Sequence, residues 1–161
     1  MILSPKLFID ACVARPLTER ILRHYSSVYP SLRITHLTDE YRQSRCDSVW
    51  VPALAQEGGW IIISADKGKD HSKPMLPQLC REYKITCVAM TNTLHHKGTA
   101  MHQEVLHEIL RNIDPIYKAP RGTIISIGLI QEKGGIVRFA FKINRIGKPQ
   151  VSLATFLQKP D

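Results

Sequence analysis

Three aspartates stand where the chain could bring their carboxylates together. Asp10 closes a short apolar run that starts at Lys6, Asp66 closes the apolar run 60–65, and Asp47 opens a helical pattern leading into that second run. Clustered carboxylates repel one another unless a cation lies among them, and Mg²⁺ or Mn²⁺ suits oxygen ligands. Such an ion polarises a phosphodiester and helps to generate a hydroxide nucleophile. The three acids therefore predict phosphodiester hydrolysis.

Side chains near these acids are candidates to assist that chemistry. Lys67 and Lys69 follow Asp66 in a polar loop, where their ammonium groups could meet substrate phosphates. Arg15 could bind phosphate or pair with a site carboxylate. Ser64, two residues before Asp66, is interpreted as a hydrogen-bond donor in the site, because no Ser-His-Asp arrangement accompanies it.

Each of these residues also has a purely structural interpretation. Asp10 could only close the turn before Pro16, Asp47 could only cap its helix, and Asp66 could only start the Asp-Lys-Gly turn. A solvated loop is the corresponding alternative for the lysines. The placement of two acids at strand ends, with a third within reach, favours the chemical interpretation.

The positions of these residues depend on an alternation of strands and helices. The pattern predicts strands over 6–10, 32–37, 60–65 and 85–90. Helices are predicted from Pro16 onward, with Leu17, Ile21, Leu22 and Tyr25 at helical spacing, from Asp47 as N-cap to Gly58-Gly59, and from Pro74 to 81 or 82. The unbroken run 60–65 is typical of a buried central strand. The alternation predicts an α/β fold with a parallel sheet, whose site lies at the carboxyl ends of the strands.

The rest of the chain has a different character. Residues 38–46 are predicted as a loop, and residues 99–113 as an amphipathic helix. Segments 123–130 and 136–143 are rich in β-formers and bracket a hairpin turn at 132–135, while 151–157 has no clear type.

The three acidic blocks together resemble a known family. Leu7-Phe-Ile-Asp10, Asp47-Ser-Val-Trp50 and Glu57-Gly-Gly-Trp-Ile-Ile-Ile-Ser-Ala-Asp66 are similar to motifs of the PIN-like nucleases, in the branch that includes VapC-type toxin ribonucleases. The resemblance covers roughly residues 6–90, and its third block is the most specific. It implies a three-layer α/β PIN-like domain over 1–120, followed by a β-rich C-terminal hairpin extension, 121–161, packed on the same domain.

The resemblance also implies an activity, a cofactor and a partner. In that family the acids bind Mg²⁺ or Mn²⁺ and cleave RNA, and many members are toxins held by a cognate antitoxin. By position, Asp10, Asp47 and Asp66 are then the metal ligands and Asp70 is a fourth catalytic acid. Other candidates for the fourth acid are Asp39, Glu40 and Glu57.

Two departures from the family pattern leave other functions open. Ala11 stands where relatives often have Asn, which weakens a hydrogen bond behind the metal ligands. Residues 121–161 are not explained by the resemblance, and could cover a sheet edge, form a homodimer contact or extend the RNA surface. The alternatives are a catalytically weak or inactive PIN-like module that binds nucleic acid or protein, and a nuclease of the same fold that acts on DNA.

Composition limits the class of protein. The chain has 161 residues, of which 43% are hydrophobic and 22% charged, as in an ordinary globular domain. With 22 Lys and Arg against 14 Asp and Glu, its net charge is +8, which suits a polyanionic partner. No apolar run approaches the roughly 20 residues that cross a membrane, and the first ten residues lack a secretory pattern. We therefore expect a cytoplasmic protein with reduced cysteines, and with Trp50 and Trp60 in the core.

Overall fold

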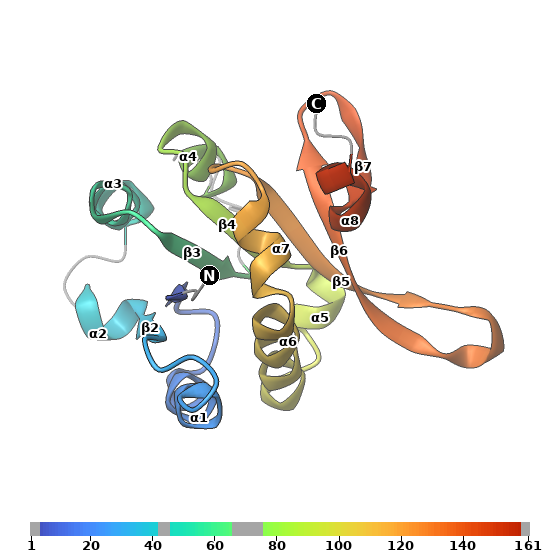
Figure 1. The fold of residues 1–161 in the computed structure, drawn as a ribbon, viewed down its shortest axis with the longest axis horizontal. Coiled ribbons are helices and arrows are strands. Elements are labelled where there is room, and N and C mark those ends of the chain that lie inside the picture. The colour runs from blue at the N-terminus through green and yellow to red at the C-terminus, as the bar shows by residue number, and fades with distance from the viewer. Residues whose placement is uncertain (1–3, 42–45, 66–75, 159–161) are drawn as a thin grey trace.

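One mixed β-sheet organises the chain. The computed structural model describes residues 4–41, 46–65 and 76–158, and within them seven strands pair in the order β2-β1-β3-β4-β5-β6-β7 (Figure 1). Pairs among β1 to β5 are parallel, whereas β5, β6 and β7 pair antiparallel. This confirms the α/β class with a mainly parallel sheet. The strands are β1 Lys6–Ile9, β2 Arg33–His36, β3 Trp60–Ser64, β4 Thr86–Met90, β5 Ile124–Gln131, β6 Val137–Arg145 and β7 Lys148–Ser152.

Helices cover both faces of the sheet and make three layers. One face carries α1 and α6 and the other α3 and α4, as Figure 1 shows. Smaller helices α5, α7 and α8 share the face of α1, and a short 3₁₀ turn forms the tip between β5 and β6. The helices are α1 Arg15–Tyr25, α2 Leu37–Glu40, α3 Asp47–Glu57, α4 Leu76–Glu82, α5 Asn92–His95, α6 Thr99–Arg111, α7 Ile113–Lys118 and α8 Leu153–Gln158.

The core divides according to the alternation of side chains along each strand. Ile61 and Ile63 of β3 pack with the cluster under α1 and α6, while Ile62 packs with the cluster under α3 and α4. Every residue of β3 is buried, because the strand lies inside the sheet with helices on both faces. The run 60–65 is therefore the central strand that its composition predicts. Trp50 and Trp60 are both buried, as expected.

Several boundaries differ from the sequence-based expectation for local reasons. Asp47 is the first residue of α3 rather than its N-cap, because the extended residue Cys46 occupies the cap position. The carboxylate of Asp47 still lies in the first turn, where negative charge favours a helix. The predicted loop 38–46 contains most of α2, whose first turn is capped by the His36 side chain accepting from the Thr38 backbone N–H. Leu22, expected on the buried face of α1, is 36% exposed at its rim.

Boundaries in the second half also shift. The predicted helix 99–113 ends at Arg111, where Asn112 caps it and α7 begins at the next residue. The segment 151–157 changes type in its middle, because the Ser152 hydroxyl accepts from the Thr155 backbone N–H and starts a helical turn. The expected hairpin is confirmed, with β5 and β6 in register from Ile124 opposite Asn144 to the turn. Its tip extends beyond the helices (Figure 1).

None of the helices in the described part of the chain is both long and apolar enough to cross a membrane.

Candidate functional site

The Asp10 carboxylate is fixed at the carboxyl ends of two central strands. Asp10 directly follows β1 and is only 8% exposed. Its Oδ2 accepts from the Ser64 hydroxyl at 2.7 Å, and its Oδ1 accepts from the Ala11 backbone N–H at 2.7 Å. The Asp10 backbone N–H donates to the Ile63 carbonyl at 2.9 Å, which extends the β1–β3 ladder by one bond. The side chain is therefore held in one orientation at the sheet edge.

Strand register explains why Asp10 and Ser64 meet. Ile9 lies opposite Ile63 in the parallel pairing of β1 and β3, so the next residues, Asp10 and Ser64, are also neighbours. Side chains alternate between the two faces along a strand. Asp10 and Ser64 follow Ile9 and Ile63, whose side chains point to the α1 side. Both therefore point to the face of α3 and α4. The sequence predicts Ser64 as a hydrogen-bond donor in the site, and its hydroxyl donates to Asp10 of the neighbouring strand.

Cys12 joins this cluster, although sequence reasoning treated it only as a reduced thiol. Its Sγ accepts from the Ala65 backbone N–H at 3.1 Å and lies 4.0 Å from the Ser64 hydroxyl oxygen. These contacts tie the turn after β1 to the end of β3. The only signal in the sequence is its position two residues after Asp10. All four cysteines are thiols rather than disulfides in the structure.

Helix length places Asp47 at the same edge of the sheet as Asp10. The 11 residues of α3 and the five of β3 each span about 16 Å, and the two run in opposite directions joined by Gly58-Gly59. The end of α3 lies at the amino edge, because the Lys6 Nζ at the start of β1 donates to the Gly58 carbonyl at 2.6 Å. Asp47, at the other end of the helix, therefore lies at the carboxyl edge.

Arg15 is paired with a carboxylate of α2. Its Nε donates to Asp39 Oδ1 at 2.7 Å, and its Nη1 lies 3.8 Å from Glu19 Oε1. The hydrogen bond to Asp39 raises the pKa of Arg15 above its usual range. Since α2 follows β2 directly, Asp39 and Glu40 also lie at the carboxyl edge. The partner that sequence reasoning left open for Arg15 is therefore an acid beside the site.

Glu57, another candidate for the fourth acid, lies at the opposite edge. It forms ion pairs with Lys6 and Arg33, which begin β1 and β2. The pKa of Glu57 is lowered by the nearby Trp60 indole N–H and by the cations Arg33 and Lys6. The indole N–H lies near the carboxylate without forming a hydrogen bond of normal geometry. A whole strand length therefore separates Glu57 from Asp10.

His36 is a buried residue that the sequence did not single out. It ends β2 and is 3% exposed. The Thr38 backbone N–H donates to its Nδ1 at 3.2 Å, so Nε2 carries the proton and donates to the Val13 carbonyl at 2.7 Å. This bridge links the turn after Asp10 to the start of α2. Its only sequence signal is a polar residue at an inward position of the strand.

The oxygen atoms of Asp10 suit a hard divalent cation. Each accepts one hydrogen bond from the protein, and a carboxylate oxygen has capacity for a further contact. Oxygen ligands of this kind are those that Mg²⁺ and Mn²⁺ take. Among the described residues, no group of three His, Cys, Asp or Glu side chains could hold a metal. Asp66, Lys67, Lys69 and Asp70 lie outside the described residues.

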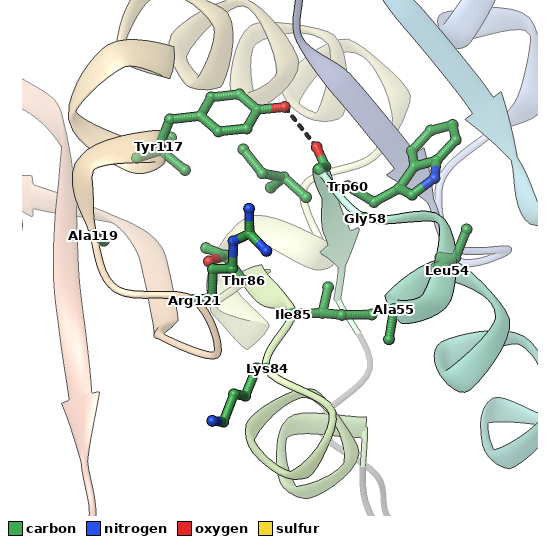
Figure 2. A pocket seen from close by; sticks show the side chains of 13 residues that line it. Leu54, Ala55, Gly58, Trp60, Lys84, Ile85, Thr86, Tyr117, Ala119 and Arg121 are labelled. Carbon is green, nitrogen blue, oxygen red and sulfur yellow. Dashed lines mark hydrogen bonds between the residues drawn. The ribbon is translucent and has the colours of Figure 1, made fainter.

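A second concave region lies at the amino edge, away from Asp10. A cavity of about 160 Å³ lies between the ends of α3 and α7. Figure 2 shows the Arg121 side chain pointing into it. The Tyr117 hydroxyl donates to the Gly59 carbonyl at 2.9 Å and fastens α7 to the sheet. Trp60 packs between Lys6 and Arg33, whose cationic groups lie 4.8 and 5.0 Å from its ring. That ring is therefore engaged within the protein.

Comparisons with known proteins match the first half of the chain. A family model described as a PIN like domain matches residues 5–73, a range that contains β1 to β3 and all four predicted acids. Neither a search of curated proteins nor a search of solved structures gave a match. Residues 5–73 are thus similar to a PIN-like domain, and strands β4 to β7 lie beyond the matched range.

Proposed function

We propose that this protein is a divalent-metal-dependent endoribonuclease that hydrolyses RNA phosphodiester bonds, and the toxin of a type II toxin–antitoxin pair. The observation that carries the proposal is the buried Asp10 carboxylate, oriented by Ser64 at the ends of two parallel strands. It lies inside the range that matches the PIN-like family model, and PIN domains usually bind divalent metals. A net charge of +8 suits an RNA substrate.

In this proposal Asp10, Asp47 and Asp66 hold Mg²⁺ or Mn²⁺, with Asp70 as a fourth catalytic acid. When bound, the ion would neutralise negative charge on the phosphodiester and activate a water molecule for attack. Ser64 and the Ala11 backbone N–H position the Asp10 carboxylate by their hydrogen bonds. The cationic groups that bind substrate phosphates are Arg15, Lys67 and Lys69.

A second candidate is a PIN-like module that binds nucleic acid or protein but has weak or no catalytic activity. The observation that favours it is Ala11, which has no polar side chain and supports Asp10 through its backbone N–H alone. Metal-dependent cleavage separates the two candidates, since only the nuclease requires it.

The test is cleavage of an RNA panel, with single- and double-stranded DNA alongside, in Mg²⁺, Mn²⁺ and EDTA. We expect metal-dependent RNA cleavage that Asp10→Asn and Asp66→Asn each abolish, because a neutral amide is a weaker metal ligand of the same shape. Asp114→Asn removes an exposed acid of α7 and should cleave as the parent does. In a bacterial host, the wild type expressed alone should slow growth and Asp10→Asn should not.

Three results would contradict parts of this proposal. Equal cleavage by the parent and Asp10→Asn would reject Asp10 as a catalytic residue. Binding without cleavage by folded protein would favour the module. Unimpaired growth despite active nuclease would reject the toxin role.

A further inference from the structure

Within the described residues, helices cover strands β5 to β7 on one face only. On the α1 side, Leu94 of α5 and Leu153 of α8 pack with residues of these strands. On the α3 side, the apolar cluster of the described residues extends only to Ile124, the first residue of β5. The remaining side chains on that face are half-buried or exposed. We call this surface, formed by Ser126, Gly128, Ala140, Lys142, Asn144 and Gln150, the open face.

A groove runs between the open face and the start of α5. It encloses about 330 Å³ and is lined by Thr91 and Thr93 on one wall, and by Gly128, Ala140 and Lys142 below. Gly128 permits this close packing, since a Cβ there would lie 2.9 Å from the Thr91 Cγ2.

Polar side chains beside the groove are held by one another. The Asn144 Nδ2 donates to the Ser126 hydroxyl at 2.8 Å, and the Gln150 Nε2 donates to the Asn144 Oδ1. These bonds fix the side chains across three neighbouring strands. The open face therefore offers polar groups that are ordered before any ligand arrives, which lowers the entropy cost of binding.

The groove continues the edge that carries Asp10. Thr91 directly follows β4, just as Asp10 directly follows β1, and the strands β1, β3, β4 and β5 are successive neighbours. Neighbouring strands lie about 4.8 Å apart, so β5 is about 14 Å from β1 across the sheet. Ser64, Ser126 and Lys142 lie on one face, because Ser64 pairs with Ala89, Ala89 with Ser126, and Ser126 with Lys142.

The charge and chemistry of the groove indicate its ligand. Among the described residues that line it there is no carboxylate, and Lys142 is exposed. Hydroxyl and amide groups come from Thr91, Thr93, Ser126 and Gln150, and apolar contacts come from Leu129, Ile130 and Ala140. Residues 81–161 contain 12 Lys and Arg against six Asp and Glu, a net charge of +6. The described residues that line the groove include no aromatic ring on which a base could stack. These features suit a sugar–phosphate backbone more than exposed bases.

We propose that the open face of β5 to β7 binds the backbone of single-stranded RNA and guides the strand toward Asp10. The proposal rests on the proposed ribonuclease function for its direction, and adds a substrate track outside the family-matched range. The contacts are to phosphate and ribose, so the binding is independent of sequence. Lys142 contributes one phosphate contact, and Ala140 forms the floor over which the strand passes.

The test measures binding of a labelled single-stranded RNA by fluorescence anisotropy in EDTA, across a salt series. Lys142→Gln should weaken binding about threefold or more at low salt and reduce the slope of log affinity against log salt by about 1. Ala140→Leu keeps the charge but fills the groove, and should also weaken binding. Lys118→Gln removes an exposed cation of α7, which contacts the amino edge through Tyr117, and should bind as the parent does.

The outcomes separate this track from the nuclease proposal. Weaker binding in both groove variants, with circular dichroism spectra like that of the parent, supports the track whether or not the protein cleaves RNA. Unchanged affinity and salt slope in folded Lys142→Gln and Ala140→Leu overturn it, even if the parent is an active nuclease. An equal loss in Lys118→Gln also overturns it, since the effect would then follow net charge alone.

Discussion

At the scale of single residues, the candidate site depends on how one carboxylate is held. Asp10 is buried, and its two oxygens receive one hydrogen bond each from Ser64 and Ala11. Only the Ser64 bond comes from a side chain. The hydroxyl is also completely buried, so no bulk water is available to replace it as a donor.

Replacing Ser64 should therefore weaken both the fold and the site. Ser64→Ala leaves a buried carboxylate oxygen without its donor, and we expect the free energy of unfolding in urea to fall by about 1 to 3 kcal/mol. Cleavage should decrease, but less than in Asp10→Asn, because the carboxylate remains. Ser26→Ala removes an exposed hydroxyl that donates to the Arg23 carbonyl, and should change stability by less than about 0.5 kcal/mol. Equal stability of Ser64→Ala and the parent would show that this hydrogen bond contributes nothing.

At the scale of elements, the end of β4 determines how closely α5 approaches β5. The Thr91 backbone N–H donates to the Ile127 carbonyl at 3.0 Å, and its hydroxyl accepts from the Leu94 N–H at the start of α5. Its methyl group packs over Gly128 of β5. Thr91 therefore provides both the cap of α5, through its hydroxyl, and one wall of the groove, where its methyl group lies over Gly128.

A double-mutant cycle tests this contact. Gly128→Ala places a Cβ 2.9 Å from the Thr91 Cγ2, and overpacking should lower the free energy of unfolding by about 1 to 3 kcal/mol. Thr91→Ser removes that methyl group but retains the capping hydroxyl. In the double variant the effect of Gly128→Ala should shrink, which denaturant unfolding of all four proteins would reveal as a coupling energy. If the effects of the two substitutions on the free energy of unfolding simply add, the destabilisation by Gly128→Ala does not come from the Thr91 methyl group.

At the scale of the whole molecule, the single sheet joins two segments of different character. Strands β1 to β3 lie in the range that matches the PIN-like family model, and β5 to β7 add an antiparallel edge beyond it. Continuous hydrogen bonding from β2 to β7 makes the sheet one unit. Ligand binding at the Asp10 edge should therefore raise the free energy of global unfolding.

Metal binding should accordingly raise the stability of the entire protein. At a free Mn²⁺ concentration of 100 times Kd, the free energy of unfolding should rise by about 2.7 kcal/mol. The measurement is the Tm with and without Mn²⁺, followed by EDTA, which should reverse the shift. Asp10→Asn should reduce the shift and Asp114→Asn should not. The same Tm increase in Asp10→Asn would indicate that the ion binds elsewhere.

The sequence by itself determined the parts that follow from local pattern. The apolar run 60–65 identifies a central strand because a strand covered on both faces needs apolar residues at every position. Gly58, with φ of 80°, ends α3 where a residue tolerant of that conformation was expected. Strand, helix and hairpin positions were largely predicted on this basis, as was the location of Asp10 at a strand end.

Only the tertiary structure decided which distant residues meet. Ser64 and Asp10 are 54 positions apart, and Arg15 and Asp39 are 24 apart. Both pairings depend on strand order and register, which the hydrophobic pattern does not specify. The same holds for Glu57, whose sequence position is compatible with the site but whose ion pairs place it at the opposite edge. The open face of β5 to β7, which no helix of the described residues covers, likewise exists because strand order sets these strands beyond the reach of α3 and α4.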